Sequence, residues 1–509
     1  MSLSCRQSGS LSGHRRLALF LTTTLAALAS SAGCQTWQKS HEAAIAHFGA
    51  GDLEISRTAL QESQQKFRSE KQLLELDQGI LDLASGDVRQ AENRFRTLRH
   101  ELEDLEQKDM TEQASSMMTD GRAVAFSGRD FERRMILNMA LLTSVLGDSQ
   151  DAFAYSIQVT EAAKARRMVL ADAGKKTADA TAVAAASPDG ATASDVTPAS
   201  FASEIKPTAM VPSPLDQPLA FSAYLAAMVQ SEQPSRYQET QQALDDVGFW
   251  NPAFSRHVAA SSSGDFGVRC QPGHGTLHVI TLVGKSPRWV SESANATSAS
   301  LLIADRIISF TGKHTLPPTI AAVKIARPEP CGSSLPVGSV RCLVTLAGTS
   351  SDSAPTPITF STIVDLNEVA ESSYHEHRDE LIAQAIARRV LKKGAVYVLK
   401  ETQKIHRNSL VDLGVNVAGV AWEAMEKADT RSWRLLPARI DIARTELPAG
   451  DWSTSLQLNG YHAHGSAQSI PIHIENGRNT CIVVLIPEKS LTGHILIGGA
   501  DNQTIPVQP

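Results

Sequence analysis

Apolar positions in the N-terminal half of the chain recur at helical spacing, and short Gly-Asp turns interrupt them. Gly51 separates two apolar-periodic runs within residues 43–61, and Gly86 does the same within 73–95, about one tetratricopeptide (TPR) period later. Two further stretches repeat the pattern less regularly, 136–167 and 218–244. These copies predict pairs of antiparallel helices joined by tight turns.

The small and large residues of the copies predict how the helices pack. In the second copy, Gly79 allows two helices to approach closely, and Phe95 fills the gap to the next pair. The pattern predicts a TPR-like α-helical solenoid over residues 34–168, continued by further TPR-like helices at 209–255. Because the copies are not evenly spaced, an ordinary antiparallel helical bundle is the alternative.

A segment of different composition separates the third and fourth copies. Residues 169–208 are rich in Ala, Thr, Ser, Asp, Gly and Pro and contain few large apolar side chains. Such a segment buries too little apolar surface to order a core. It is therefore predicted to be a flexible linker or insertion.

The apolar pattern changes to short β-rich runs in the C-terminal half. These runs occupy residues 262–366 and 429–509, and a helical pair is predicted between them at 367–428. The order of strands, two helices and strands predicts a C-terminal α+β domain with a largely antiparallel sheet and helices over one face. The whole chain is thus predicted to be an α+β multidomain protein.

Residues 1–33 have the pattern of an export signal, with a basic start, an apolar run and small residues before Cys34. Residues 31–34 resemble the lipobox of bacterial lipoproteins, in which the cysteine receives a diacylglycerol, although Ser31 replaces the usual Leu. Cleavage at Ala27-Leu28-Ala29 to give a soluble exported protein, or retention as an uncleaved anchor, are the alternatives. Lipidation of Cys34 is the preferred prediction, because no later apolar run approaches the length needed to cross a bilayer.

Four cysteines follow in the C-terminal half, where an exported chain can form up to two disulfides in three connectivities. A turn-rich segment joins Cys331 to Cys342, which would leave Cys270 to pair with Cys481. Buried free thiols are the alternative.

The net charge of the chain is -6, which gives no support to a nucleic-acid partner.

Few side chains suggest a binding site or a reaction. Asp429, Arg431, Trp433 and Arg434 lie close together in the sequence and could form a ligand-binding cluster, with guanidinium groups over the indole. The alternative is a structural junction at which Asp429 ends a helix and Trp433 anchors a strand. We predict no catalytic motif, cofactor or metal site.

Three stretches of the chain carry a resemblance to a known family. "TIVDLNEVAE", "AIARRVLKK" and above all "KADTRSWRLLPARIDIARTELPAG" resemble an uncharacterised family of bacterial TPR-containing lipoproteins. The resemblance implies an envelope location and helical repeats ahead of this block, and it implies no enzymatic activity. The Ala/Ser-rich insertion and the extended tail after Gly450 depart from the compact form of that family.

Together these features favour a non-enzymatic cell-envelope lipoprotein. We expect the TPR-like repeats to bind envelope protein partners and an N-terminal lipid to hold the chain on the outer membrane, facing the periplasm. The alternative is a periplasmic hydrolase or carbohydrate-binding protein with a site in the C-terminal α+β domain.

Overall fold

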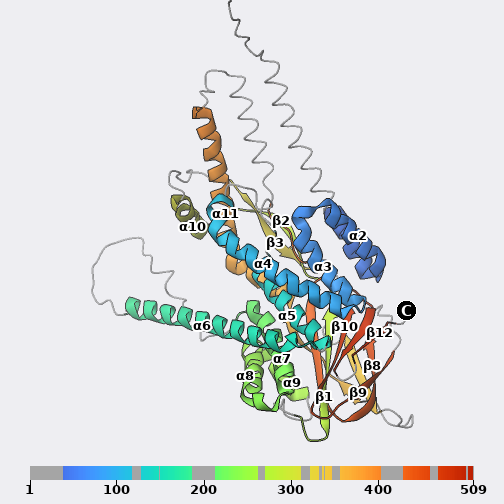
Figure 1. Cartoon of the computed structure of the whole chain (residues 1–509). Helices are drawn as coiled ribbons and strands as arrows, with labels where there is room; N and C mark the ends of the chain where they lie inside the picture. The colour runs from blue at the N-terminus through green and yellow to red at the C-terminus, as the bar shows by residue number, and fades with distance from the viewer. Residues whose placement is uncertain are drawn as a thin grey trace, which may run out of the picture.

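The chain has an α+β fold in which helices cover one face of a mixed sheet (Figure 1). No helix in the part of the chain described here is long and apolar enough to span a bilayer. The computed structural model describes residues 38–116, 126, 128–147, 149–185, 212–261, 270–310, 321–331, 335–336, 339–346, 356–402, 428–458, 468–499 and 502–507.

The N-terminal helices form successive hairpins. A first helix at residues 38–50 is followed by α2, and the pairs α3–α4, α5–α6 and α7–α8 come next, each helix packing against its neighbour. Their bounds are α2 Leu53–Lys66, α3 Lys71–Ala84, α4 Val88–Ser116, α5 Asp130–Leu146, α6 Asp151–Ala185, α7 Gln217–Ser231, α8 Tyr237–Trp250 and α9 Pro252–Ser261.

Glycine ends the first helix of two hairpins because the backbone there enters the left-handed region. Gly86 has a φ of 81°, and the backbone N–H of Asp87 donates to the carbonyl oxygen of Asp82 at 2.9 Å. Gly51 has a φ of 88° and stands in the same position after the helix at 38–50. Glycine adopts this conformation without steric cost, so the Gly-Asp pattern correctly marked two helix ends.

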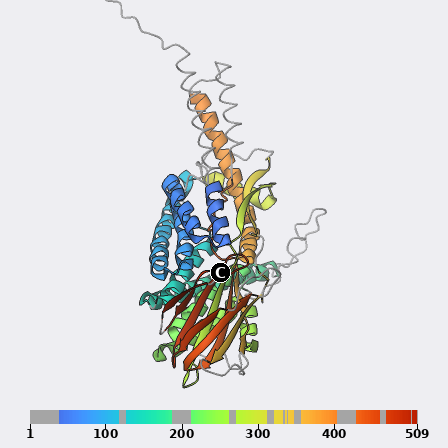
Figure 2. The same ribbon diagram turned by 90° about the vertical axis from the view of Figure 1, so that its right-hand side faces the viewer.

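Twelve strands in the described residues form three sheets (Figure 2). The six-stranded sheet has the order β12-β11-β10-β1-β7-β6, the four-stranded sheet the order β5-β4-β8-β9, and β2 pairs with β3. The strands are β1 His274–Val283, β2 Arg288–Ala294, β3 Val323–Glu329, β4 Val340–Leu346, β5 Thr356–Ile358, β6 Ser361–Asp365, β7 Arg439–Pro448, β8 Gly450–Leu458, β9 Ser469–Ile474, β10 Asn479–Ile486, β11 Thr492–Gly498 and β12 Gln503–Pro506.

The six-stranded sheet is buried on both faces. In β10, Ile482 and Val484 pack toward the four-stranded sheet, whereas Cys481, Val483 and Leu485 pack toward the helices. Successive side chains of β10 thus pack in two different cores. Because both faces of the strand are buried, its sequence is an uninterrupted apolar run. One core lies between the two sheets, and the larger one joins the helices to the sheet.

The inner helices α3, α5 and α7 are enclosed on nearly all sides. α7 is apolar around its whole circumference, which is typical of a helix surrounded by protein. α3 and α5 contact β11, and α7 contacts β6. A Cβ on Gly493 of β11 would lie 2.0 Å from the carbonyl oxygen of Ala84 at the end of α3. The chain's own sheet therefore covers the face of these helices that an open helical repeat array would present to a partner.

The predicted linker is partly helical. α6 continues to Ala185, so residues 169–185 extend a helix instead of forming a flexible segment, and the rest of the predicted linker up to 208 lies largely outside the described residues. The reason is composition, because this stretch is rich in Ala, which has the highest helix propensity. Low apolar content therefore does not by itself predict the lack of a helix.

The C-terminal elements also differ from the predicted ones. Helix α10 (Ser298–Phe310) lies in the segment predicted to be β-rich, and α11 (Leu366–Thr402) covers the first predicted helix. Most of the second predicted helix falls at 403–427, outside the described residues. The sheet is mixed, because β1 and β10 run parallel with Val279 opposite Ile482.

The predicted disulfides are absent, since all four described cysteines are free. Cys342 points into the core between the sheets, whereas Cys331 donates from its Sγ to the carbonyl oxygen of Ser286 at 3.2 Å. Cys481 points from β10 toward the helices. Burial raises the pKa of the Cys342 thiol to about 11 and that of Cys481 to about 12, so both stay protonated and unreactive at neutral pH.

Candidate functional site

The predicted cluster lies on an extended segment that joins the helical layer to the sheet. Residues 428–436 run beside the first half of α3 and the start of α5 before β7 begins at Arg439. Two buried carboxylates bind the backbone of this segment. Asp77 of α3 accepts the backbone N–H of Leu435 at 2.7 Å, and Glu132 of α5 accepts that of Trp433 at 2.8 Å. Both carboxylates are fully buried.

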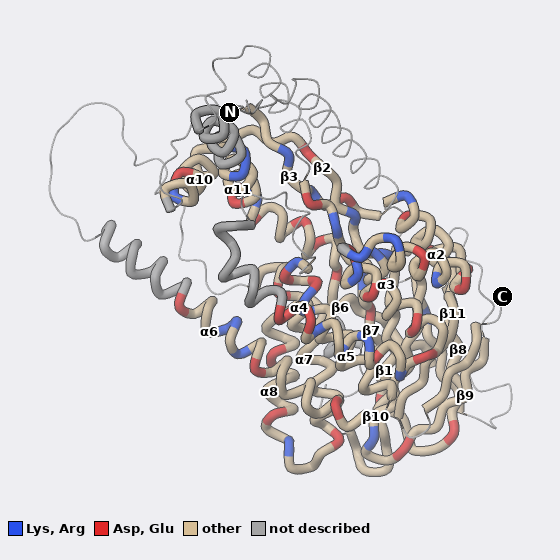
Figure 3. Tube along the Cα trace, turned by 45° about the horizontal axis from the view of Figure 1, so that its top comes forward, with Lys and Arg blue, Asp and Glu red and all other residues tan. Residues whose placement is uncertain are grey.

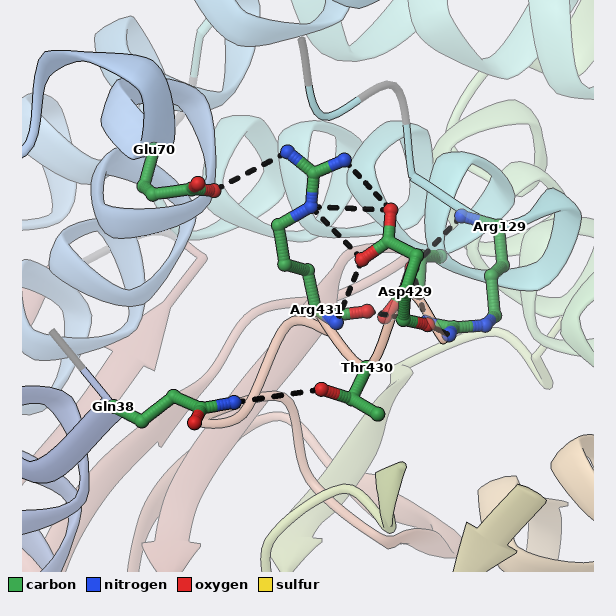
Figure 4. Close-up of polar contacts among 7 residues, drawn as sticks. Gln38, Glu70, Arg129, Asp429, Thr430 and Arg431 are labelled. Carbon is green, nitrogen blue, oxygen red and sulfur yellow. Dashed lines mark hydrogen bonds and ion pairs between the residues drawn. The ribbon is translucent and has the colours of Figure 1, made fainter. Parts of the chain in front are cut away.

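Charged side chains complete the junction (Figure 4). Arg431 donates from Nη2 to the Asp429 carboxylate at 2.6 Å and from Nη1 to Glu70 at 3.4 Å. Arg129 donates to the backbone carbonyl oxygens of Arg431 and Asp429, at 2.6 and 3.4 Å. Burial alone would raise the pKa of Asp429, but the hydrogen bonds and charge of Arg431 outweigh it and lower that pKa.

The predicted stack of guanidinium groups on Trp433 is not formed. The Trp433 side chain is fully buried, with its ring 5.8 Å from that of Phe95. Cation–π contacts of this region instead join Arg129 to Trp289 of β2, with the guanidinium carbon 3.7 Å from the ring centre, and Arg431 to Phe126, at 5.9 Å. Asp429, Arg431 and Trp433 thus make the contacts of a structural junction, and Arg434 lies at its edge.

Sequence reasoning missed the side chains that hold this segment. Asp77 lies in "LLELDQGILDL", where a carboxylate interrupts the apolar face of a helix, and its other oxygen lies 2.5 Å from His41 Nε2. A charged residue on a buried helical face requires a polar partner. The sequence could therefore have predicted that Asp77 and Glu132 need polar partners. It could not have identified partners some 300 residues away in the chain.

Two clefts flank the segment. One, of about 460 Å³, lies toward β3 and α11, and its lining includes Arg129, Tyr374 and Asp429. The other, of about 680 Å³, lies between β2 and the start of the helix at 38–50. Trp289 and Arg431 border both clefts. These clefts fall within the size range of small-molecule sites.

A smaller cavity of about 180 Å³ lies between α7, β1 and β10. His278 lines this cavity. Its Nδ1 lies 2.7 Å from the Tyr224 hydroxyl oxygen, and its Nε2 lies 3.1 Å from the Oδ1 of Asn479. The Asn479 amide nitrogen donates to the carbonyl oxygen of Met228 at 2.8 Å. Its Oδ1 is therefore an acceptor, His278 carries its proton on Nε2, and the Tyr224 hydroxyl donates to Nδ1.

Within this network the His278 imidazole is neutral. Burial, reinforced by the charge of Arg444, lowers the pKa of His278 to about 3. Burial also raises the pKa of Tyr224. Cys270 lines the same cavity, but both nitrogens of His278 already have partners, so the imidazole is not placed to take a proton from the thiol.

Neither the metal-binding side chains nor the comparisons with known proteins assign a function to the chain. Within the described ranges, no three His, Cys, Asp or Glu side chains converge in a way that could hold a metal ion. Cys34 lies outside the described residues. No family model, curated protein or solved structure matches the chain.

Proposed function

We propose that the chain is a non-enzymatic lipoprotein of the bacterial cell envelope that acts as a scaffold or adaptor for other envelope proteins. Cys34 would carry the lipid, and the protein would face the periplasm from the outer membrane. The export-like N-terminal pattern and the helical hairpins support this proposal.

The finer part of the proposal is that the hairpins are TPR-like repeats. Support comes from packing inside the second hairpin, where a Cβ on Gly79 would lie 2.7 Å from the ring of Phe95. A small residue thus lets the two helices approach while the aromatic ring fills the space between them. Because the sheet covers the inner helices, partners would bind the outer helices.

The observation that carries the adaptor function is the exposed apolar surface of α6. This helix extends beyond α5 and α7 (Figure 1). Met168 and Val169 on it are 71% and 57% exposed, and Ile157 is 42% exposed. Ile157 and Met168 are 11 residues apart, about three turns, so they lie on one side of the helix. Exposed apolar side chains grouped on a projecting element are typical of a protein-binding surface.

Crosslinking and purification from native membranes tests this function. The wild-type chain should recover the same envelope protein in repeated experiments, and Met168→Glu combined with Val169→Glu should abolish that recovery. Leu302→Glu is the matched control, because Leu302 is an apolar residue of α10, outside the helical hairpins, that is 75% exposed. If the wild-type chain recovers no envelope protein above background, the adaptor function is wrong.

The anchor requires its own test. Growth with a labelled fatty acid should label the wild-type chain and leave Cys34→Ala unlabelled. An unlabelled wild-type chain would contradict the lipoprotein assignment without affecting the crosslinking result.

The alternative, a hydrolase or carbohydrate-binding protein, would use the cavity at His278. Its volume of about 180 Å³ is below the usual range for ligand sites, and its imidazole is engaged at both nitrogens. A hydrolase or carbohydrate-binding site at this cavity is therefore less well supported than the adaptor function. Saturable binding of an oligosaccharide that His278→Gln abolishes would reverse this preference.

A further inference from the structure

The cleft of about 680 Å³ beside the start of the first helix has a lining rich in cations. Lys39 comes from the helix at 38–50, Arg288 from β2, and Arg431 and Arg434 from the extended segment, whereas Glu42 is the acidic residue of the lining. Lys39, Arg288 and Arg434 therefore bring positive charge to one cleft from three separate elements, whereas the charge of Arg431 is already paired with Asp429 and Glu70. Figure 3 shows that cationic and acidic positions are interspersed around β2, β3 and α3.

Several hydrogen-bond donors at this cleft have no partner among the described residues. They are the Oγ of Ser432, the Nε of Arg434 and the Nε1 of Trp289, all buried atoms of side chains that line the cleft. Ser432 is 2% exposed and Trp289 is 6% exposed. A buried donor without an acceptor costs free energy, so a ligand that brings oxygen acceptors into the cleft gains affinity by satisfying them.

The acidic residues near the cleft accept only some of the hydrogen bonds that its arginine side chains can donate. Arg434 pairs with Glu42 through Nη1 at 3.8 Å, and Arg288 pairs with Glu329 at 2.6 Å. Each guanidinium has five N–H donors, so one ion pair does not exhaust it. Lys39 is exposed at the rim. A phosphate group fits this set well, since its oxygens accept hydrogen bonds from several directions at once.

The position of the cleft in the chain identifies the source of that phosphate. Gln38 and Lys39 line the cleft, and Gln38 is four residues after Cys34. Four Cα–Cα steps span at most about 15 Å. A lipid on Cys34 would therefore hold this cleft within about 15 Å of the membrane surface.

We propose that this cleft binds the phosphate of an anionic lipid headgroup in the membrane to which the chain is anchored. The membrane location rests on the proposed lipidation of Cys34, whereas the phosphate chemistry rests on the cleft alone. The headgroup would orient the protein, with the cleft toward the bilayer and the sheets away from it.

The test uses the full chain carrying Cys34→Ala, so that no acyl chain contributes to binding. It is mixed with vesicles of phosphatidylcholine, with or without phosphatidylglycerol, and bound protein is measured by flotation. Binding is expected only with phosphatidylglycerol. Lys39→Gln with Arg288→Gln should weaken it about 25-fold, because each cation near an anionic surface contributes about fivefold. The matched control is Lys164→Gln with Arg256→Gln, which removes two exposed cations from α6 and α9.

A second variant separates the cleft from general charge attraction. Ser432→Ala keeps every charge and should still weaken vesicle binding several-fold, whereas an unchanged affinity would overturn binding in the cleft. Equal binding to both vesicle types, or an equal loss in the control variant, would also overturn the proposal. So would binding of inorganic phosphate without vesicles at an affinity that phosphatidylglycerol vesicles do not exceed, since the site would then be one for free phosphate.

These outcomes are independent of the anchor test. Fatty-acid labelling of the wild-type chain reports only on Cys34, and flotation of the Cys34→Ala chain reports only on the cleft. Failure of one is thus distinguishable from failure of the other.

Discussion

Lowering the pH should destabilise the chain through His278. The folded protein holds this imidazole neutral, with a pKa lowered from 6.5 to about 3 by burial and by Arg444. An unfolded histidine titrates near 6.5. Between these two values the unfolded chain binds a proton that the folded chain does not, so the free energy of unfolding falls as the pH drops.

The magnitude follows from the two pKa values. At pH 5 the unfolded imidazole is almost fully protonated and the folded one is not. The pH then lies about 1.5 units below the unfolded pKa, which lowers the free energy of unfolding by about 2 kcal/mol. At pH 7 the same difference is close to zero. The His278 contribution should thus lower stability by about 2 kcal/mol from pH 7 to pH 5.

Urea unfolding followed by tryptophan fluorescence, at pH 7 and at pH 5, measures this effect. His278→Gln keeps a donor and an acceptor but cannot titrate, so its loss of stability between the two pH values should be about 2 kcal/mol smaller than that of the wild type. Buried acids such as Glu132 titrate alike in both chains and cancel in the comparison. Tyr224→Phe is the control, because it removes one hydrogen bond at His278 and keeps the imidazole. If wild type and His278→Gln lose equal stability, the buried neutral imidazole is not the cause.

Three further tests, each measured by the urea midpoint of unfolding, probe the packing and the junction. Gly79→Val should cost about 1–3 kcal/mol because a Cβ there would lie 2.7 Å from the Phe95 ring, and Phe95→Leu should recover part of the loss. Gly493→Ala should cost about 3 kcal/mol because its φ is 79° and its Cβ would meet backbone, whereas Gly477→Ala, with a φ of 75° and open space, should cost about 1 kcal/mol. Arg431→Ala should cost about 2–3 kcal/mol because a partly buried carboxylate loses its partner, and unchanged stability would refute a structural role.

Local pattern predicted most of the elements. The apolar runs of β1 and β10 are strands, and the glycines at 51 and 86 end helices, because strand alternation and left-handed turns depend on residues next to each other. The helical stretch 169–185 was predicted wrongly because the absence of a core was equated with the absence of a helix. Short apolar runs do not distinguish a buried strand from a buried helix, and α10 was missed for that reason.

The sequence located the candidate cluster and offered two interpretations, and its contacts are those of the structural junction. Asp429 and Arg431 are two residues apart, and their ion pair follows from that proximity. The stacking of an arginine on an indole was assigned to Trp433, whereas it joins Arg129 to Trp289. Proximity in sequence favours local ion pairs, but it does not determine which aromatic ring reaches a guanidinium from another element.

The sequence by itself determined the class of the fold, the two helix ends at glycine and the apolar character of the central strands. These follow from backbone sterics and from the periodic placement of apolar side chains. Only the tertiary structure decided that β1 pairs in parallel with β10 and that a sheet covers α3, α5 and α7. It also decided that Asp77 and Glu132 bind the backbone at 433–435. These contacts join residues far apart in the chain, and they form because buried carboxylates and backbone groups must find partners once water is excluded.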